Sequence, residues 1–433
     1  MSTKMKSTVY YVSSLNGNDA NDGLTKETAF LTLDKINSIA LGAGDKVLLE
    51  NGSVFENQYL HIKAAGDING EPIEIGAYGD GEDMPHIAAN GKGLWFQDYG
   101  TVLDFQHHVY KGDVSSAVLL YDTENIIIHD IEISNKEEFK NMEAYCAENK
   151  IDRTGVAVVA QNRGTVHSIT LDNLSIHDVN GNVYNKHMNN GGIYMTCFTP
   201  ADEEKTGVAR YDGVTVNGCF VKNVSRWGIA VGYSYRHNDF STKELDEETF
   251  KKYGNENIVI TNNYVKFAGG DAITPMYALS PLVEHNMSDS CACEMNDRYY
   301  KYPGKRMGKV AAAIWPWKCK NALLRYNEAV DTKVNQDGMA YDADSGDGTT
   351  YDSNYSRLNE GGCMMFCMQQ AVHNTFTNNV SVDDLSGTMT PASNPDAYVA
   401  NNKFYVRKGV PFRRPRNHGK MTLKDNEIIK IQK

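Results

Sequence analysis

Long apolar runs are missing from this chain of 433 residues. No stretch approaches the ~20 apolar residues that a helix needs to span a bilayer. Residues 1–8 carry charges but no apolar stretch of signal-peptide type. We therefore expect no membrane partner and, as the chain stands, a cytoplasmic protein. A secreted protein whose leader had been removed would show the same sequence.

Positive charge is also scarce, because 43 Lys and Arg face 55 Asp and Glu and leave a net charge of −12. An acidic surface repels phosphate backbones and anionic lipids, which argues against nucleic acid as a partner. It also weighs mildly against polyanionic substrates such as pectate or alginate. The one notable basic cluster, residues 407–416, lies near the end of the sequence, and we expect it to be a solvated face.

Cysteine pairs at zinc-binding spacing are absent as well. The eight cysteines include Cys291-x-Cys293 and Cys363-x3-Cys367, both in apolar, strand-like contexts, and we expect buried free thiols. The acidic run after Gln336 lacks the twelve-residue ligand pattern and the flanking helices of a calcium loop of the helix-loop-helix kind. We expect that no cofactor is required. No motif supports a structural or site Ca²⁺, and the sequence leaves metal binding open.

What the chain has instead is a repeat of short β-rich segments that close on Asn or Asp. There are ten of them, at residues 126–130, 169–173, 214–218, 259–263, 282–286, 323–327, 350–354, 375–379, 398–402 and 422–426. The late segments follow one another every 23 to 27 residues, and the early gaps are about twice as long. A period in the twenties with one strand-turn unit per repeat indicates a solenoid, and the doubled gaps indicate insertions.

Each unit is too short to bury its own apolar face, so it must stack on its neighbours, as in a parallel β-helix. Asn tolerates left-handed backbone angles at a tight corner, and stacked Asn side chains can hydrogen-bond from coil to coil. An antiparallel sandwich with frequent Asn turns is the alternative, but it needs no fixed period. We expect Asn354, Asn379 and Asn402 to stack in one ladder.

The N-terminal residues carry a family resemblance. The segments 10–14, 17–23, 29–33 and 44–49 resemble the opening of secreted-type right-handed β-helix carbohydrate-active enzymes. In those families the Gly-Asn-Asp-x-Asn-Asp-Gly loop precedes an amphipathic helix that caps the first coil. A cap is needed because that coil would otherwise present an unpaired edge. The residues with the spacing for this helix are Leu33, Ile36, Ile39 and Ala40.

We therefore predict an all-β fold, a single right-handed parallel β-helix. It would occupy residues 1–433, with the cap at 9–60 and repeated coils at 117–433. Long insertions are expected near 136–153, 180–190, 235–255 and 288–309, and residues 244–252 should form a short helix within the third.

The densest chemistry follows Gln336. Asp337, Asp342 and Asp344 flank an apolar Met-Ala-Tyr strand, and Glu360 follows about one coil later. Carboxylates this concentrated repel, so a fold keeps them only where a cation, a basic partner or catalysis needs them. A solvated acidic loop is the alternative, but it would sit in a tip rich in Ser and Gly instead of beside an apolar strand.

Solenoid geometry offers two carboxylate pairs. Successive coils lie about 4.8 Å apart. Matching carboxylates on adjacent coils therefore have about the separation of ~5 to 5.5 Å that a retaining glycosidase needs. Carboxylates two coils apart have about the ~6.5 to 9.5 Å that an inverting glycosidase needs. Asp337 and Glu360 are 23 residues, or one coil, apart. Asp271 begins the equivalent strand two coils before Asp337. A retaining and an inverting pair that share Asp337 are thus both open.

The string Asp-Gly-x-Ala-aromatic-Asp-x-Asp, followed by Asn-Tyr-Ser-x-x-Asn-Glu-Gly-Gly, carries a second resemblance. It resembles the catalytic region of β-helix retaining glycoside hydrolases, notably the lacto-N-biosidase family and, more distantly, a β-xylosidase family. The first family implies Asp337 as acid/base and Asp344 as nucleophile, seven residues apart. The second implies Asp337 with Glu360. The chain satisfies both patterns, so the second carboxylate stays open.

We therefore predict a glycoside hydrolase, retaining, that cleaves a glycosidic bond in an oligosaccharide or glycan. The residues expected to shape the sugar site are Asp271, Asp342, Arg357, Trp315, Trp227, Tyr233 and His187. The aromatic residues could instead pack the insertions onto the solenoid.

Two other functions are open. A polysaccharide lyase needs a basic residue and a cation or arginine, and only Lys333 and Arg357 are basic among these carboxylates in the sequence. A non-catalytic glycan-binding solenoid predicts aromatic residues without paired carboxylates.

Overall fold

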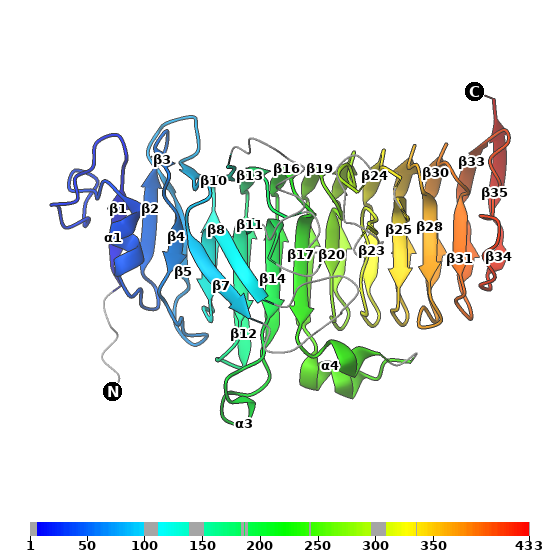
Figure 1. Ribbon diagram of the computed structural model, residues 1–433, viewed down its shortest axis with the longest axis horizontal. Helices are drawn as coiled ribbons and strands as arrows, with labels where there is room; N and C mark the ends of the chain where they lie inside the picture. The colour runs from blue at the N-terminus through cyan, green and yellow to red at the C-terminus, as the bar shows by residue number, and fades with distance from the viewer. Residues whose placement is uncertain are drawn as a thin grey trace.

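The protein folds into an elongated parallel β-helix (Figure 1). The computed structural model describes residues 7–98, 111–137, 151–182, 186, 189–241, 244–295, 309–334 and 336–432. The strands stack along one long axis, from the N-terminal coils at the left of Figure 1 to the C-terminal coils at the right. None of the helices in these ranges has the length and apolar character of a membrane span.

The first sheet contains all ten segments of the Asn repeat. Its 13 strands, in spatial order, are β1 (Val9–Val12), β2 (Lys46–Glu50), β5 (Ile73–Tyr78), β9 (Ile126–His129), β12 (Thr165–Asp172), β15 (Arg210–Asn217), β18 (Glu256–Thr261), β21 (Leu282–Glu284), β23 (Leu323–Arg325), β26 (Thr350–Asp352), β29 (Thr375–Thr377), β32 (Tyr398–Ala400) and β34 (Thr422–Lys424). Neighbours pair in parallel, and Phe376 of β29 lies opposite Tyr351 and Val399. The antiparallel sandwich is therefore excluded.

The second sheet runs beside the first for almost the same length. Its 12 strands are β3 (Val54–Glu56), β6 (His86–Ala88), β10 (Glu132–Asn135), β13 (Ser175–Val179), β16 (Phe220–Val224), β19 (Tyr264–Ala268), β22 (Met287–Asp289), β24 (Glu328–Val330), β27 (Tyr355–Arg357), β30 (Val380–Val382), β33 (Lys403–Arg407) and β35 (Glu427–Ile431).

The third face is divided into two sheets. One comprises β4 (Leu60–Ile62), β8 (Lys111–Tyr121), β11 (Asp152–Ala160), β14 (Gly191–Cys197), β17 (Trp227–Ser234) and β20 (Ile273–Pro275), with β7 (Leu94–Asp98) antiparallel to β8. The other comprises β25 (Met339–Asp344), β28 (Gly362–Cys367) and β31 (Met389–Ala392). Between β20 and β25 one coil contributes isolated bridges, in which Ile314 pairs with Ile273 and Tyr341.

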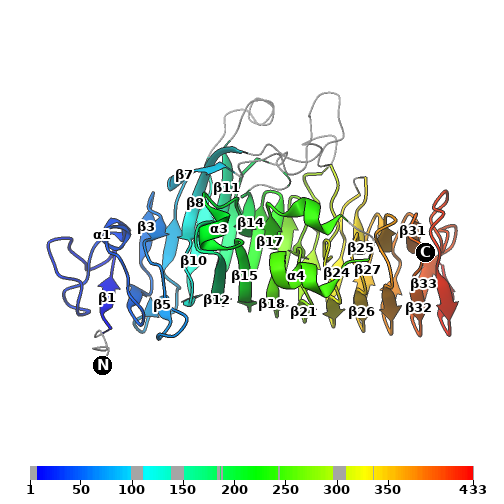
Figure 2. The ribbon, with the colours of Figure 1, turned by 90° about the horizontal axis from the view of Figure 1, so that it is seen from below.

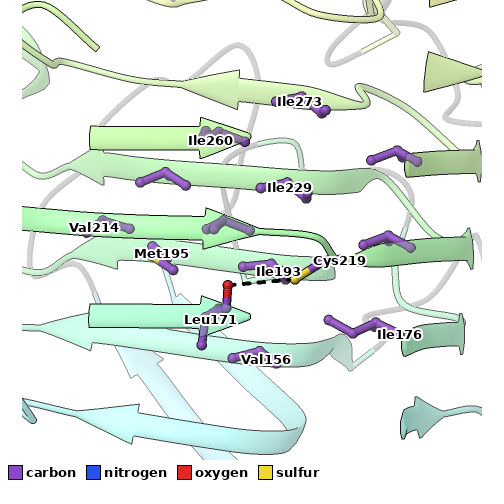
Figure 3. Packing of buried hydrophobic residues seen from close by; sticks show 14 of the residues in the cluster. Val156, Leu171, Ile176, Ile193, Met195, Val214, Cys219, Ile229, Ile260 and Ile273 are labelled. Carbon is purple, nitrogen blue, oxygen red and sulfur yellow. Dashed lines mark hydrogen bonds between the residues drawn. The ribbon is translucent and has the colours of Figure 1, made fainter. Parts of the chain in front are cut away.

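Apolar side chains from all three faces fill the interior. Because side chains alternate along a strand, β2 shows alternating buried and half-buried residues. In Figure 3, Leu171 and Val214 of the first sheet, Ile176 of the second and Ile193 of the third belong to one packed cluster. The described cysteines are all free, as predicted; Cys197, Cys219, Cys291, Cys319 and Cys363 are buried, and Cys293 and Cys367 are half-buried.

An asparagine ladder runs along the corner after the first sheet. Its members are Asn263, Asn286, Asn327, Asn354, Asn379, Asn402 and Asn426. At each step the side-chain amide of one Asn donates to Oδ1 of the next, over 3.0 Å from Asn354 to Asn379 and 3.1 Å from Asn379 to Asn402. The predicted stacking of these three residues is confirmed.

The left-handed backbone at this corner lies one residue before the ladder, not on the ladder asparagines themselves. Asn262, Tyr326 and Ser353, for example, have φ angles of 58°, 55° and 55°. A non-glycine residue there costs roughly 1–2 kcal/mol, which the ladder's hydrogen bonds offset. In earlier coils the ladder position is apolar, as at Leu174 and Cys219, so those coils have no asparagine there.

Helices are few and lie at the ends or outside the coils. Helix α1 (Leu33–Ser38) buries Leu33 and Ile36, in agreement with the predicted cap. Ile39, however, follows the helix with an extended backbone, and Ala40 is exposed, so the predicted helix was too long.

The third insertion contains the turn of 3-10 helix η1 (His237–Phe240) and helix α4 (Glu247–Tyr253). The predicted helix at 244–252 therefore exists, although it begins later, where Asp246 caps it by accepting a hydrogen bond from the Thr249 amide at 2.7 Å. Helices α3 (Glu203–Thr206) and α4 project below the strands in Figure 1. In Figure 2, which is seen from below, they lie in front of the strands. Large parts of the other three predicted insertions lie outside the described residues.

Candidate active site

The outer side of the third face carries a second apolar cluster, separate from the interior of the solenoid. It includes the three aromatic residues predicted to bind sugar, Trp227, Tyr233 and Trp315, which are 0%, 0% and 3% exposed. Trp227 stacks on Trp315 with ring centroids 6.4 Å apart, and Tyr233 stacks on Trp317 at 5.9 Å. Protein atoms cover these rings, so in this structure they pack loops onto the solenoid, which is the alternative that the sequence left open.

Asp271 holds Trp315 in place. It is fully buried before β20, and its Oδ1 accepts hydrogen bonds from the Trp315 indole nitrogen at 3.0 Å and the Ala312 amide at 3.1 Å. Its Oδ2 lies 3.5 Å from a guanidinium nitrogen of Arg226, which is equally buried. Because a buried carboxylate needs such partners, the pair fixes the backbone and the tryptophan beside the site. Asp271 is therefore buried against Trp315, and its part in shaping the sugar site stays a prediction.

Lys186 brings a positive charge to the same place. Its side chain is 5% exposed, and Nζ lies 5.2 Å from the ring centroid of Trp315 and 6.0 Å from that of Trp227. Nζ also donates to the carbonyl of Val310 at 3.2 Å. The Trp227 indole donates in turn to the backbone carbonyl of Lys186. An ammonium over two indole rings is favourable, and here it lies beside the carboxylates.

Strand β25 carries two of the predicted carboxylates on its outer side. Tyr341 and Ala343 belong to the interior cluster, so the alternation of the strand turns Asp342 and Asp344 the other way. The backbone of Asp344 pairs with that of Trp317 in an isolated β-bridge. Oδ1 of Asp344 accepts a hydrogen bond from the Ser345 hydroxyl at 2.6 Å. The sequence therefore delivers both groups to the aromatic cluster by strand alternation alone.

Asp342 is 4% exposed, and its Oδ1 makes no hydrogen bond to any described residue. Burial, together with the nearby Asp344 and Asp337, raises the pKa of Asp342 well above its usual value. Such surroundings disfavour the charged form of a carboxyl group, because it would be poorly solvated and close to other carboxylates. Asp342 therefore holds its proton more strongly than an exposed aspartate does.

Asp337 is half-buried just before β25. Burial raises the pKa of Asp337 to about 6, with Lys186 and Arg414 opposing the rise and Asp344 and Asp271 adding to it. This pKa is suited to a group that must donate and accept a proton near neutral pH. Arg414 is half-buried and contributes charge here, so the expectation that residues 407–416 form only a solvated face is wrong for this residue.

Glu360 lies one coil after Asp337 in register, since Met339 pairs with Gly362. Its carboxylate, however, accepts a hydrogen bond from the Val334 amide at 2.8 Å and lies 3.6 Å from the Lys333 ammonium. The groups that act on the pKa of Asp337 include Asp344 and do not include Glu360 among the largest. Asp344 thus affects the pKa of Asp337, whereas the Glu360 carboxylate is bonded to the Val334 amide; which of the two pairs with Asp337 in catalysis stays a prediction.

One predicted sugar-binding residue lies on another face of the solenoid, and a second falls outside the described residues. Arg357 is the exposed last residue of β27, on the second sheet, whereas the carboxylates lie on the third face. His187 lies outside the described residues. Sequence reasoning placed Arg357 near the site because it lies close to Glu360 in the chain, but a solenoid coil carries such neighbours to different faces.

A cation could approach one group of ligands at this site. A carboxylate oxygen of Asp342, one of Asp344 and the Cys367 sulfur lie within 4.8 Å of one another. A thiol is a poor ligand for Ca²⁺, which takes six to eight oxygens. Burial also raises the pKa of the Cys367 thiol, so a thiolate is disfavoured there. The donor set therefore does not fit calcium.

Three basic residues of this region were not identified from the sequence. Lys186 sits within a predicted insertion, Arg226 precedes Trp227, and Arg414 belongs to a cluster that sequence alone assigned to solvent. Their contribution comes from coils far apart in the chain, and no local motif marks it. Together with a carboxyl whose pKa is near 6 and an adjacent aspartate, they form a site able to transfer protons at a sugar oxygen.

Comparisons with known proteins agree with this chemistry. Two crystal structures of the GH136 lacto-N-biosidase from Eubacterium ramulus, one native and one a selenomethionine derivative, are each 59% identical to this chain with a TM-score of 0.95. Each match covers 98% of this chain and 68% of the other. No family model matches the chain.

A curated relative, the lacto-N-biosidase of Bifidobacterium longum subsp. longum, is 41% identical over 99% of this chain. The chain spans only 29% of the length of that protein. The identity to the Eubacterium ramulus enzyme extends over two thirds of that enzyme and confirms the family that the acidic string predicted. The chain therefore belongs to glycoside hydrolase family 136, the family of these lacto-N-biosidases.

Proposed function

We propose that this chain is a retaining glycoside hydrolase in which Asp337 is the general acid/base and Asp344 the nucleophile. The observation that carries the proposal is the pKa of about 6 at Asp337, which depends in part on the negative charge of Asp344. Two carboxyl groups whose environments push their pKa values apart can divide the acid and nucleophile roles between them. The seven-residue spacing also matches the pattern of the lacto-N-biosidase family.

In the first step the Asp344 carboxylate attacks the anomeric carbon while the Asp337 carboxyl gives its proton to the departing glycosidic oxygen. The Ser345 hydroxyl, 2.6 Å from Oδ1 of Asp344, holds the carboxylate in one orientation. A covalent glycosyl-enzyme forms, and Asp337 is left ionised. The nearby charges of Lys186 and Arg414 stabilise that ionised state.

In the second step Asp337 takes a proton from a water molecule, whose oxygen attacks the same anomeric carbon and releases Asp344. Each of the two substitutions inverts the anomeric carbon. After two inversions the product has the configuration of the substrate. Asp342, buried beside both carboxyl groups and with its pKa raised, is placed to hydrogen-bond with a sugar hydroxyl or with the nucleophile. We propose no cofactor for either step.

The substrate we propose is an oligosaccharide with a lacto-N-biose unit, because two matched proteins are lacto-N-biosidases. The aromatic cluster around Trp315 would then be the wall on which loop residues pack to form the sugar site. The proposal concerns this chain alone, which corresponds to part of the length of its relatives.

A polysaccharide lyase is less well supported, although one argument against it has weakened. The sequence placed only Lys333 and Arg357 near the carboxylates, whereas the structure brings Lys186 and Arg414 to Asp337. A basic residue is therefore present after all. The family membership and the proton-donating Asp337 still favour hydrolysis.

A substrate panel would test the proposal. The chain should release nitrophenol from a nitrophenyl lacto-N-bioside much faster than from a nitrophenyl xyloside, and NMR of the first product should show the anomeric configuration of the substrate. Pectate and alginate should give no rise in ultraviolet absorbance. An unsaturated product from either polysaccharide, with no activity on the neutral glycosides, would establish a lyase instead. An inverted first product would exclude the nucleophilic role of Asp344.

A further inference from the structure

A cluster of two histidines and a glutamate lies on the second sheet, away from the face that carries the carboxylates. His86 begins β6, Glu132 begins β10, and His177 lies in β13, so three adjacent coils each contribute one residue. Strands β10 and β13 are neighbours in Figure 1. Ile87, Ile133 and Ile176 point inward from the same strands, which turns these polar residues outward.

The ligand atoms of the three side chains converge. His86 Nδ1 lies 3.8 Å from Oε1 of Glu132, and His177 Nε2 lies 2.8 Å from that same oxygen. One ligand atom from each residue lies within 4.8 Å of the other two. Nitrogen and oxygen ligands about 2.0–2.2 Å from a tetrahedral Zn²⁺ are ~3.4 Å from one another. The observed separations lie on either side of that value, so small side-chain rotations would seat an ion.

The nitrogen of each ring that faces away from the cluster has its own partner. Nδ1 of His177 lies 2.9 Å from Oδ2 of Asp178, and Nε2 of His86 lies 2.8 Å from the Ser134 hydroxyl. Metal-binding histidines are held this way, with the second nitrogen bonded to a carboxylate or another polar group that fixes the ring and its tautomer. Nε2 of His177 and Nδ1 of His86 are thus the atoms oriented toward a shared ion.

Charge and burial also suit a cation. The side chains of His86, Glu132 and His177 are 20%, 33% and 25% exposed, which leaves a path for an ion and a fourth position for water. Glu56 and Asp178 add negative charge nearby, while Lys222, in register with His177 on the next coil, opposes it.

We propose that His86, Glu132 and His177 form a binding site for a divalent transition-metal ion of the Zn²⁺ class. Two imidazoles and one carboxylate are a ligand set that binds Zn²⁺ in proteins, with water completing the tetrahedron. The ion would add a link across three successive coils of the second sheet, beside the strand pairing and the side-chain hydrogen bonds already there. It stabilises the N-terminal half of the solenoid and takes no part in the proposed hydrolysis.

The experiment uses the whole chain, stripped with a chelator and titrated with ZnCl₂ by calorimetry. The chain should bind one ion at this site, and His86→Gln and His177→Gln should each abolish that binding event. Asp178→Asn, which keeps all three ligands but removes the carboxylate behind His177, should weaken affinity about tenfold or more. The same additions should raise the Tm of the chain and leave that of His177→Gln unchanged.

A matched control is available on the first sheet. His129 contacts Glu74 at 3.4 Å and Asp130 at 2.7 Å, and its side chain is 24% exposed, but no other histidine of the described ranges joins it in a ligand group. His129→Gln should bind ZnCl₂ like the unaltered chain.

Equal binding by the His177 and His129 variants, or no binding by the unaltered chain, would overturn the proposal. Should a Gln variant fail to fold, CoCl₂ on the unaltered chain decides: a visible spectrum of tetrahedral cobalt supports the site, and its absence rejects it.

Discussion

The first sheet of the solenoid is continuous, whereas the third face is interrupted. The first sheet runs unbroken from β1 to β34, and the Asn ladder closes its corner over the later coils. The third face is interrupted between β20 and β25, where one coil supplies only isolated bridges. Asp271 lies before the interruption, Trp315 lies within it, and Asp337 lies just before the strand that follows it. Regular pairing joins the coils of the first sheet, whereas the third face is interrupted beside the strand that carries the candidate carboxylates.

The sharpest test of this contrast is the loss of Asp337. Asp337→Asn should lower activity on a confirmed substrate by roughly thousands-fold, because the proton donor and acceptor is removed. Stability should not fall. Since folding raises the pKa of Asp337 from 3.8 to about 6, ionised Asp337 costs stability above that pH, and the neutral Asn does not. The Tm of the variant at about pH 8 should equal or exceed that of the unaltered chain.

Asp344→Ala should be equally inactive, and azide should restore turnover with inverted product configuration if Asp344 is the nucleophile. Substantial activity in Asp337→Asn would show that the site is wrongly assigned, whatever holds for the fold.

The reverse pattern is expected in the ladder. Asn354→Ala removes hydrogen bonds to the Leu324 carbonyl and to Asn327 and Asn379, all in the interior. Buried groups left without partners should cost about 3 kcal/mol of unfolding free energy in total, while activity below the new Tm stays near normal. Denaturant unfolding measures this. Asn426→Ala, in the half-buried last coil, is the control and should cost less than half as much.

The pH profile tests the charges that the third face gathers. Activity should fall as the pH rises through about 6, because Asp337 must be protonated to act as the acid. Lys186 lowers the pKa of Asp337, so Lys186→Met should move this alkaline limb to higher pH. Lys333→Met is the matched control, since Lys333 pairs with Asp331 and Glu360 and should leave the limb in place. Equal shifts in both variants would contradict the assignment.

The smallest effect should come from Glu360. Glu360→Gln keeps an oxygen for the Val334 amide and loses only the weak pairing with Lys333, so unfolding free energy should change by less than about 1 kcal/mol. Activity should remain within a few-fold of normal. A loss comparable with that of Asp337→Asn would instead make Glu360 the second catalytic carboxylate, as the β-xylosidase resemblance implied.

Much of the fold could be predicted because each coil repeats the same local problem. A β-branched strand followed by a polar corner recurs at every coil, and all ten segments found in the sequence became strands of one sheet. The left-handed position was misplaced by one residue, because at Tyr326 and His285 the side chain itself gives no sign of it. The same conformation occurs at Asp130 and Asn173, where the next residue is apolar, so it belongs to the corner of the coil and not to one residue type.

The site was less predictable, for the same physical reason. Asp337, Asp342 and Asp344 could be found because they share one strand and its flank. Lys186 and Arg414 belong to coils far from these aspartates in the chain and come near them only through the stacking of the coils. Arg357 was misplaced because nearness along a coil does not mean nearness in space when each coil turns through three faces.

The residues before the ladder, such as Ser353, Asn378 and Asn401, share one backbone conformation and each precedes an interchangeable asparagine. Successive corners are therefore geometrically equivalent, and one can take the place of the next. A lineage can gain or lose the 23 residues between Asn379 and Asn402 as a unit, since Asn379 would then meet Asn426 in the same geometry. Within a strand a deletion of one or two residues has no such equivalent position, whereas the turns absorb it, since the late segments recur at intervals of 23 to 27 residues. The length of this protein is therefore free to evolve in whole coils and in loops, and almost nowhere else.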